Sequence, residues 1–447
     1  MSHLLNDAAK RASRYLESLN TRAVAPNKEA LAALAGFDQA FPEHACSAEA
    51  VLAELDEIGS PATMASAGGR FFGFVTGGAL PATVAANWLA TAWDQNAGLV
   101  VSSPTNAALE NVSLRWVKNI FHLPEHSAGG FVTCATAANF SALAAARHTL
   151  LARAGWDVEA QGLFGAPPLT VVVGAEVHAS VQKALSLVGF GRDRVVRVPV
   201  DAQGRMRLDA FPEVDDRTIV CVQAGNVNSG AFDPISELCE RAHLNGAWVH
   251  VDGAFGMWAA AAPARAHLTR GVEDADSWAT DAHKWLNVPY DSGLVFTRHA
   301  DALRQAMSVG GAYLAQDDDR VPYQYTPDFS RRARGIEVWA ALRQLGRPGL
   351  ADLIERTCRY AEQFAAGLRA AGYRVLNDVV LNQVLVSFGS AERTREVIAL
   401  VQREGTCWCG GTLWQGHAAM RISVSSWATT EEDVQRSLAA ILRVAAS

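Results

Sequence analysis

Short apolar runs alternate with amphipathic stretches through the middle of this 447-residue chain. Apolar runs bounded by glycine, proline or acidic residues are typical of buried strands, and the alanine- and leucine-rich stretches between them are typical of helices. We predict strands at residues 131–133, 169–174, 195–200, 218–223, 247–251 and 294–296, and helices at residues 140–151 and 181–187. This alternation predicts an α/β fold with a mainly parallel sheet between helices.

The two ends of the chain follow other patterns. Residues 1–66 indicate helices joined by linkers, with too little apolar surface to fold alone, so we expect an arm that packs on a partner subunit. Towards the C-terminus, helices are expected at residues 336–345, 350–371 and 430–444, and strands at 373–375, 381–388 and 420–424. The predicted organisation is an N-terminal helical arm (1–66), a large domain (67–334) and a smaller C-terminal α+β domain (335–447).

Composition narrows the classes of function. A hydrophobic content of 49% and a charged content of 19% are typical of globular proteins. The net charge of −7 argues against nucleic acid or an anionic membrane as the main partner. No apolar run approaches the roughly 18 residues of a membrane span. The seven cysteines show no metal-ligand spacing, so we expect no metal site and a reducing, cytoplasmic location.

Two residues suggest the chemistry. The strand predicted at 247–251 stops at Asp252, and an acid at the carboxyl end of a parallel strand lies where ligands collect in open α/β sheets. Lys284 follows in a loop before the next strand. A pyridoxal phosphate (PLP) enzyme needs this pair, because the lysine forms a Schiff base with the cofactor and the carboxylate keeps the pyridine nitrogen protonated. Either residue alone is more often structural; together they favour a PLP site.

The sequences around both residues resemble one family. VHVDGAFG at residues 249–256 and DAHKW at residues 281–285 are similar to the group II PLP-dependent decarboxylases, which include the aromatic-L-amino-acid and glutamate decarboxylases. The similarity extends from about residue 68 to about residue 343. It implies the PLP-dependent transferase fold (fold type I), PLP as cofactor, an L-amino acid as substrate and a homodimer.

The resemblance also implies roles for individual residues. It places His178 and Ala254 on the two faces of the cofactor ring, although a lone histidine here is more often a helix cap. Tyr313 would protonate the substrate carbon, with Tyr323 and Tyr325 as rivals, and Ser330 would reach the phosphate of a neighbouring subunit. The remaining contacts to the cofactor are expected from Ala135, Thr136, Asn226, Thr280 and His283.

Two of these cofactor contacts depart from the family pattern. The loop with Ala135 and Thr136 lacks the glycines found in many relatives, and an alanine-rich helix start is common by itself. Asn226 and Val227 stand where many relatives carry two threonines. Both assignments therefore depend on their context in the chain.

The substrate pocket is predicted from an aromatic loop at residues 68–81. Phe74, Thr76 and Leu99 would line it, although ordinary core packing also explains these residues. An aromatic or other apolar amino acid is favoured, because an acidic substrate needs a cation and Arg70 is the one candidate. A diamine-forming enzyme could use the acids at residues 317–319, which otherwise form a solvated run.

Other functions remain possible on the sequence. Transamination would need an arginine such as Arg421 on the substrate carboxylate, and an oxygen-consuming reaction would give an aldehyde. Retention of His178 and Tyr313 favours decarboxylation over the aldehyde within this family. A dinucleotide-dependent oxidoreductase would need a GxGxxG motif after a strand, and none is found. A non-catalytic relative would be expected to lack Lys284 or Asp252.

Overall fold

The computed structural model describes residues 1–308 and 320–447 and divides into two compact units. The larger unit comprises Ala79–Arg359 with Asn377–Gln383, and the smaller comprises Met1–Gly78, Tyr360–Leu376 and Val384–Ser447. The helical arm thus shares a unit with the C-terminal segment. This division differs from the predicted boundaries at 66/67 and 334/335.

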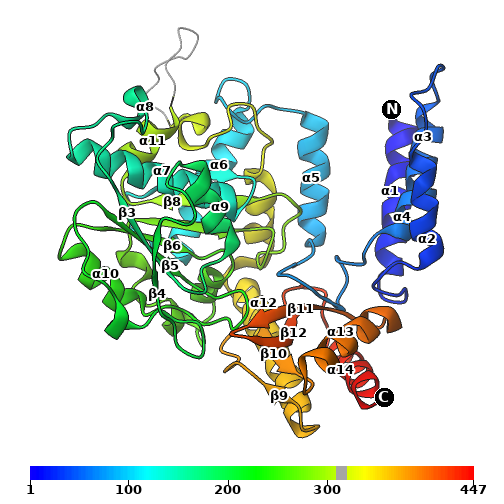
Figure 1. Cartoon of the computed structure of the whole chain (residues 1–447). Coiled ribbons are helices and arrows are strands. Elements are labelled where there is room, and N and C mark those ends of the chain that lie inside the picture. Colours follow the sequence, from blue (N-terminus) through cyan, green and yellow to red (C-terminus); the bar gives the residue numbers. More distant parts are fainter. Residues whose placement is uncertain (309–319) are drawn as a thin grey trace. The chain divides into compact units, whose positions relative to one another are not determined.

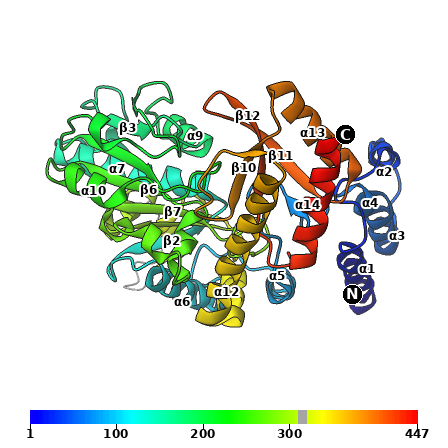
Figure 2. The same ribbon diagram turned by 90° about the horizontal axis from the view of Figure 1, so that it is seen from below.

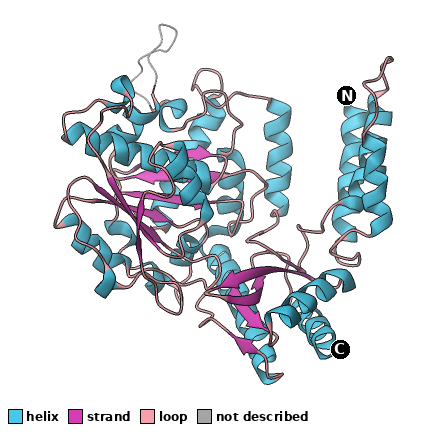
Figure 3. Ribbon diagram, in the orientation of Figure 1, coloured by secondary structure: helices cyan, strands magenta, loops and turns pink. Residues whose placement is uncertain are grey.

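A seven-stranded sheet forms the centre of the larger unit (Figure 3). Its strands, in spatial order, are β2 (Ala128–Val132), β8 (Gly293–Thr297), β7 (Ser277–Asp281), β6 (Trp248–Asp252), β5 (Thr218–Gln223), β3 (Thr170–Gly174) and β4 (Val195–Val198). All neighbours pair in parallel except that β8 runs antiparallel to both β7 and β2. The prediction of a mainly parallel α/β sheet is confirmed.

Helices cover both faces of this sheet. α7 and α9 lie on one face and α10 on the other (Figure 1). The helices of the unit are α5 (Pro81–Trp93), α6 (Pro104–Ile120), α7 (Ala135–Arg153), α8 (Val158–Gln161), α9 (Ala179–Leu187), α10 (Ile235–His243) and α11 (Ala300–Met307). α12 (Gly335–Ala370) changes direction at Gly346, where φ is 57°, as expected from the break predicted after residue 345.

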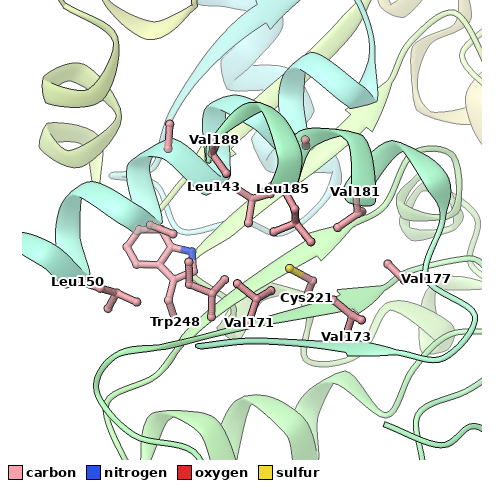
Figure 4. Packing of buried hydrophobic residues seen from close by; sticks show 14 residues of the cluster. Leu143, Leu150, Val171, Val173, Val177, Val181, Leu185, Val188, Cys221 and Trp248 are labelled. Carbon is pink, nitrogen blue, oxygen red and sulfur yellow. The ribbon is translucent and has the colours of Figure 1, made fainter. Parts of the chain in front are cut away.

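The core between α7, α9 and the sheet is built from aliphatic side chains around Trp248 (Figure 4). Val171 and Val173 of β3 meet Leu143 of α7 and Val181 of α9, all buried. Each buried side chain of this kind stabilises the fold by roughly 1.5–3 kcal/mol. The alanines of α7 allow the helix to approach the strands closely, which brings its N-terminus to the sheet edge where β6 and β7 end.

Sequence analysis missed strand β7. Its residues, SWATD, include three polar side chains, all of them buried. A buried strand is normally recognised by continuous apolar character. Here Trp248 donates to Ser277 Oγ and Ala135 N donates to Asp281, so these two buried polar groups are satisfied by tertiary hydrogen bonds.

The smaller unit combines helices with a five-stranded sheet (Figure 2). The sheet runs β1 (Phe71–Phe72), β11 (Trp408–Trp414), β12 (His417–Ser423), β10 (Gln383–Ser387) and β9 (Arg374–Val375). Its helices are α1 (Ser2–Ser18), α2 (Lys28–Ala33), α3 (Ala48–Glu54), α4 (Ser60–Ala62), α13 (Ala391–Glu404) and α14 (Glu431–Ala446). Thr430 begins α14 with a capping box to Asp433. Within the described residues, no helix is long and apolar enough to cross a membrane.

We expect Asp276→Asn to destabilise the larger unit by about 2 kcal/mol at pH 7. Asp276 accepts hydrogen bonds from His243 and His299 at 3.0 Å each and from Val249 N at 2.8 Å. Although burial opposes ionisation, these partners lower the pKa of Asp276 to about 2. A lowered carboxyl pKa gives stability that is complete above its ordinary value, near 4, and lost as pH falls towards 2.

Urea unfolding at pH 7 and at pH 3 measures this effect. The difference between Asp276→Asn and the parent should shrink at the lower pH. Asp274→Asn, an exposed acid two residues away, is the matched control and should change little. Equal stability of the parent and Asp276→Asn at pH 7 would contradict the prediction.

Candidate active site

Asp252 ends β6 with its side chain buried, only 5% of the residue being exposed. Ala254 N donates to its Oδ1 at 3.2 Å. Asn139 Nδ2 and Ser180 Oγ each approach Oδ2 at 3.4 Å. Because hydrogen-bond donors favour the ionised form of a buried carboxyl, this arrangement suits an anion at the carboxyl end of the strand.

Lys284 lies in a short loop after β7 that is held rigidly on both sides. Ala282 N and His283 N donate to Ser292 O at 2.9 and 3.2 Å, and Ser292 N donates to His283 Nδ1 at 3.0 Å. On the other side, Trp285 Nε1 donates to Thr357 Oγ1 at 3.0 Å. The lysine side chain itself remains 21% exposed. The loop therefore presents a reactive amine from a fixed backbone.

The side chain of His283, beside the lysine, contacts other residues of the same loop. Its ring stacks on Tyr290 with the centroids 4.3 Å apart. Burial lowers the pKa of His283, so the ring is neutral at pH 7. Its predicted contact with the cofactor stays a prediction.

Asp281 connects the lysine to the start of α7. Its Oδ2 lies 2.9 Å from Lys284 Nζ, and its Oδ1 accepts a hydrogen bond from Ala135 N at 2.6 Å. Burial alone would lower the pKa of Lys284, but Asp281, with a smaller contribution from Asp252, outweighs it and raises the pKa above the ordinary value. In the protein without its cofactor, the Asp281 carboxylate therefore decides the direction in which the pKa of Lys284 shifts.

The first turn of α7 is suited to an anion. Ala135 N already donates to a carboxylate, which demonstrates that negative charge is stabilised at this helix N-terminus. Gly293, at the start of β8, leaves little room beside the turn, because a Cβ there would lie 2.6 Å from the carbonyl carbon of Cys134. Ala135, at the start of α7, therefore lies beside the lysine loop. The phosphate contact expected of Ala135 and Thr136 stays a prediction.

His178 serves as the N-cap of α9. Its Nδ1 accepts from Ser180 N at 3.2 Å and lies 2.8 Å from Ser180 Oγ. The structural interpretation of this histidine is therefore correct, and Ser180 also connects it to Asp252. Its role on the cofactor ring stays a prediction.

Asn226 and Thr280, both predicted to contact the cofactor, have different surroundings. Asn226 is buried and uses its amide within its own loop, donating to Gln223 Oε1 at 3.2 Å and accepting from Asn228 N at 2.9 Å. Thr280 is buried on β7, and its hydroxyl has no hydrogen-bond partner among the described residues. The predicted contacts of Asn226 and Thr280 with the cofactor stay predictions.

The predicted substrate residues fall in both units. Leu99 belongs to the larger unit, in a loop where its carbonyl accepts from Ser103 Oγ at 3.1 Å. Phe74 and Thr76 belong to the smaller unit. Phe74 is 63% exposed and stacks on Trp408 with centroids 5.8 Å apart, and Trp408 stacks in turn on Phe71 at 5.2 Å. This stack involving Trp408 was not predicted from the sequence.

The two candidate arginines also lie in the smaller unit. Arg70 is only 4% exposed, and its guanidinium donates to the backbone carbonyls of Arg22, at 3.0 Å, and Thr406. The acidic-substrate alternative thereby loses its candidate, because this cation is used structurally. Arg421 lies on β12 opposite Gly410, where burial lowers its pKa.

Of the candidate proton donors, Tyr313 lies outside the described residues, as do the acids at 317–319. Tyr323 is buried against Phe329, with ring centroids 4.6 Å apart. Tyr325 packs towards the core of α7 and β8 and lies under the guanidinium of Arg320 at 4.7 Å. Both rivals of Tyr313 therefore have structural partners. Ser330 accepts from Asn96 Nδ2 at 3.4 Å.

The chain belongs to the pyridoxal-dependent decarboxylase family, whose conserved domain matches residues 31–389. It is an enzyme of this class, and its cofactor is pyridoxal phosphate.

Individual relatives are more distant. An aromatic-L-amino-acid decarboxylase of Bacillus atrophaeus is 25% identical over 390 residues, covering 82% of this chain and 79% of the relative. A phenylacetaldehyde synthase of Arabidopsis thaliana is 26% identical over 365 residues, covering 75% and 73%. The crystal structure of Oryza sativa TDC with PLP and tryptamine matches the fold with a TM-score of 0.91 at 22% identity, covering 100% of this chain and 97% of that one.

The residues present fit the cofactor. An amine for its aldehyde, a buried carboxylate for its ring nitrogen and a helix N-terminus for its phosphate lie at one edge of one sheet.

We expect Asp281→Asn to speed covalent attachment of the cofactor to Lys284 at neutral pH. Without the carboxylate, burial dominates and the pKa of Lys284 falls, so more of the amine is neutral and able to attack. Stopped-flow absorbance after mixing PLP with cofactor-free protein across a pH series gives the rate. The midpoint of the dependence of this rate on pH should move to lower pH in Asp281→Asn. It should not move in Asp274→Asn, the control at an exposed acid. An unmoved midpoint in Asp281→Asn would contradict the assigned role.

Proposed function

We propose that this protein removes the α-carboxylate of an L-amino acid with an aromatic or other apolar side chain, giving the amine and carbon dioxide. In the balanced reaction the substrate loses carbon dioxide and gains one proton at the α-carbon. Family membership supports this reaction class. The observation that carries the proposal is the grouping of Asp252, Lys284 and the start of α7 at one sheet edge.

The cofactor would be held by residues of the larger unit. Bound to Lys284, pyridoxal phosphate supplies the electron sink that accepts the electrons of the breaking bond. Asp252 would hold the proton on its ring nitrogen, and the first turn of α7 at Ala135 and Thr136 would hold its phosphate. His178 and Ala254 are proposed to flank the ring, as in the family.

Proton transfer requires a donor at the substrate carbon. Tyr313 is proposed for this role on the family resemblance, and the packing of Tyr323 and Tyr325 supports that choice, because both have structural partners. The amine of Lys284 would be free while the substrate is attached to the cofactor and would take the cofactor back as the product leaves. Asp281, 2.9 Å from Lys284 Nζ, would stabilise the free amine in its protonated form.

The proposed substrate class rests on the side chains that are available to contact the substrate. Phe74 presents an exposed aromatic face on the stack with Trp408 and Phe71. Arg70, the cation considered for an acidic substrate, donates its hydrogen bonds to backbone carbonyls instead. Both observations support an apolar or aromatic side chain.

An oxygen-consuming reaction is the second candidate. The phenylacetaldehyde synthase among the relatives motivates it. Such a reaction would convert the amino acid, oxygen and water into an aldehyde, carbon dioxide, ammonia and hydrogen peroxide. The presence of both His178 and Tyr313 in this chain favours the amine instead.

A homodimer in a reducing, cytoplasmic compartment completes the proposal. α5 leaves Trp88, Leu89 and Trp93 about half exposed, and a second copy of the chain would cover them. None of the seven cysteines, all of which lie in the described residues, forms a disulfide, and this suits a reducing environment.

Incubation of the PLP-loaded protein with pooled L-amino acids, with and without oxygen, tests the reaction. We expect amine and carbon dioxide from one aromatic or apolar amino acid, independent of oxygen and lost in Lys284→Ala. Mass spectrometry separates the products. Aldehyde with ammonia would establish the second candidate, and keto acid without carbon dioxide would overturn decarboxylation and give Arg421 a role on the carboxylate.

Once the substrate is identified, the proposed contact between its side chain and Phe74 can be tested. We expect Phe74→Ala to raise KM about tenfold with a smaller change in kcat, since lost apolar contact weakens binding. Phe41→Ala, on an arm residue that is 94% exposed, is the matched control. If both variants keep the parental KM, Phe74 does not contact the substrate.

A further inference from the structure

A chain of hydrogen-bonded side chains runs behind Asp252. Trp248 Nε1 donates to Ser277 Oγ at 2.9 Å, and Ser277 Oγ lies 3.0 Å from His250 Nδ1. His250 Nε2 lies 2.9 Å from Asn139 Oδ1, and Asn139 Nδ2 donates to Asp252 Oδ2 at 3.4 Å. The chain crosses β7, β6 and α7, and all of its residues are buried.

The direction of this chain follows from the donors available. A carboxylate can only accept, so the amide of Asn139 turns its NH2 group towards Asp252 and its Oδ1 towards His250. Since Asn139 Oδ1 can only accept, His250 carries a proton on Nε2 and donates it to Asn139. The Nδ1 of the neutral ring then accepts from Ser277 Oγ, which itself accepts from Trp248 Nε1.

The neutral state of the histidine agrees with this order. Burial lowers the pKa of His250 to about 3, so the ring stays uncharged across the physiological range. A neutral imidazole with a proton on Nε2 has one acceptor and one donor, and both are used. Every link therefore points the same way, towards the carboxylate.

Asp252 is held from other directions as well. Ala254 N donates to Oδ1 at 3.2 Å, and Ser180 Oγ approaches Oδ2 at 3.4 Å from the first turn of α9. These donors come from the strand end itself and from α9, whereas Asn139 is the contact from α7. The orientation of Asn139 is the one that depends on a distant network.

We propose that Asn139 and His250 are positioning residues that hold the carboxylate of Asp252 in the orientation that faces the ring nitrogen of the cofactor. The physical reason is that a donor to the charged form stabilises a buried carboxylate, whereas a carbonyl oxygen in its place would repel it. The proposal rests on the proposed function only through the role of Asp252, and it requires no knowledge of the substrate.

Cofactor labelled with 15N in the ring tests the proposal on the loaded protein without turnover. Asn139→Leu preserves volume but removes the donor, so the ring-nitrogen resonance should move from the protonated towards the unprotonated position. Cofactor affinity should fall roughly 10- to 100-fold, as expected for a lost hydrogen bond to a charged group. His250→Phe should shift the resonance in the same direction.

Two controls separate positioning from packing. Val251→Ala alters a fully buried neighbour whose side chain points to the opposite face of β6, so it destabilises the fold without touching the network. Trp248→Phe leaves the Ser277 hydroxyl able to donate to His250 and should have the smallest effect of the network variants. A parental resonance and affinity in Asn139→Leu, or an equal shift in Val251→Ala, would overturn the proposal.

A measurement on the unaltered protein tests the proposal even where the variants fail to fold. With 15N-labelled histidine, His250 should show a neutral ring with its proton on Nε2 between pH 5 and about pH 8, because its lowered pKa excludes the charged form there. A proton on Nδ1 or a charged ring would reverse the order of donors and overturn the proposal. Absence of decarboxylation alone would affect only the proposed function, since both readouts need only bound cofactor or none.

Discussion

Parallel pairing of β6 with β7 is the constraint on which the site depends. Asp252 lies opposite Ala279, so both strands end at the same edge of the sheet. Asp281 then follows at the end of β7, and Lys284 three residues later ion-pairs with it. A change of register would separate the carboxylate of Asp252 from the loop that carries Lys284.

Burial of charge at this edge is made possible by backbone and side-chain donors. Asp281 accepts from the first amide of α7, and Asp252 accepts from Ala254 N and the amide of Asn139. Burying a carboxylate without such partners would be costly. The same donors that stabilise the fold therefore hold two carboxylates in place beside a lysine, and this combination is what the cofactor requires.

Much of the larger unit could be predicted from the chain. Asp252, Lys284 and the α7 start stood out because strand ends and helix starts concentrate ligands in α/β sheets. The polar strand β7 was missed, since local pattern assigns burial only to apolar residues. Asp281 was overlooked although it stands three residues before the lysine.

The sequence by itself determined the residue types, the order of the elements and the family whose motifs it resembles. Tertiary structure alone decided which polar groups meet. Asn139 and His250 are 111 residues apart, and Asp281 and Ala135 are 146 apart. Hydrogen bonds between such residues depend on how α7 packs on the sheet, which no local propensity records. The orientation of the Asn139 amide and the raised pKa of Lys284 are consequences of that packing.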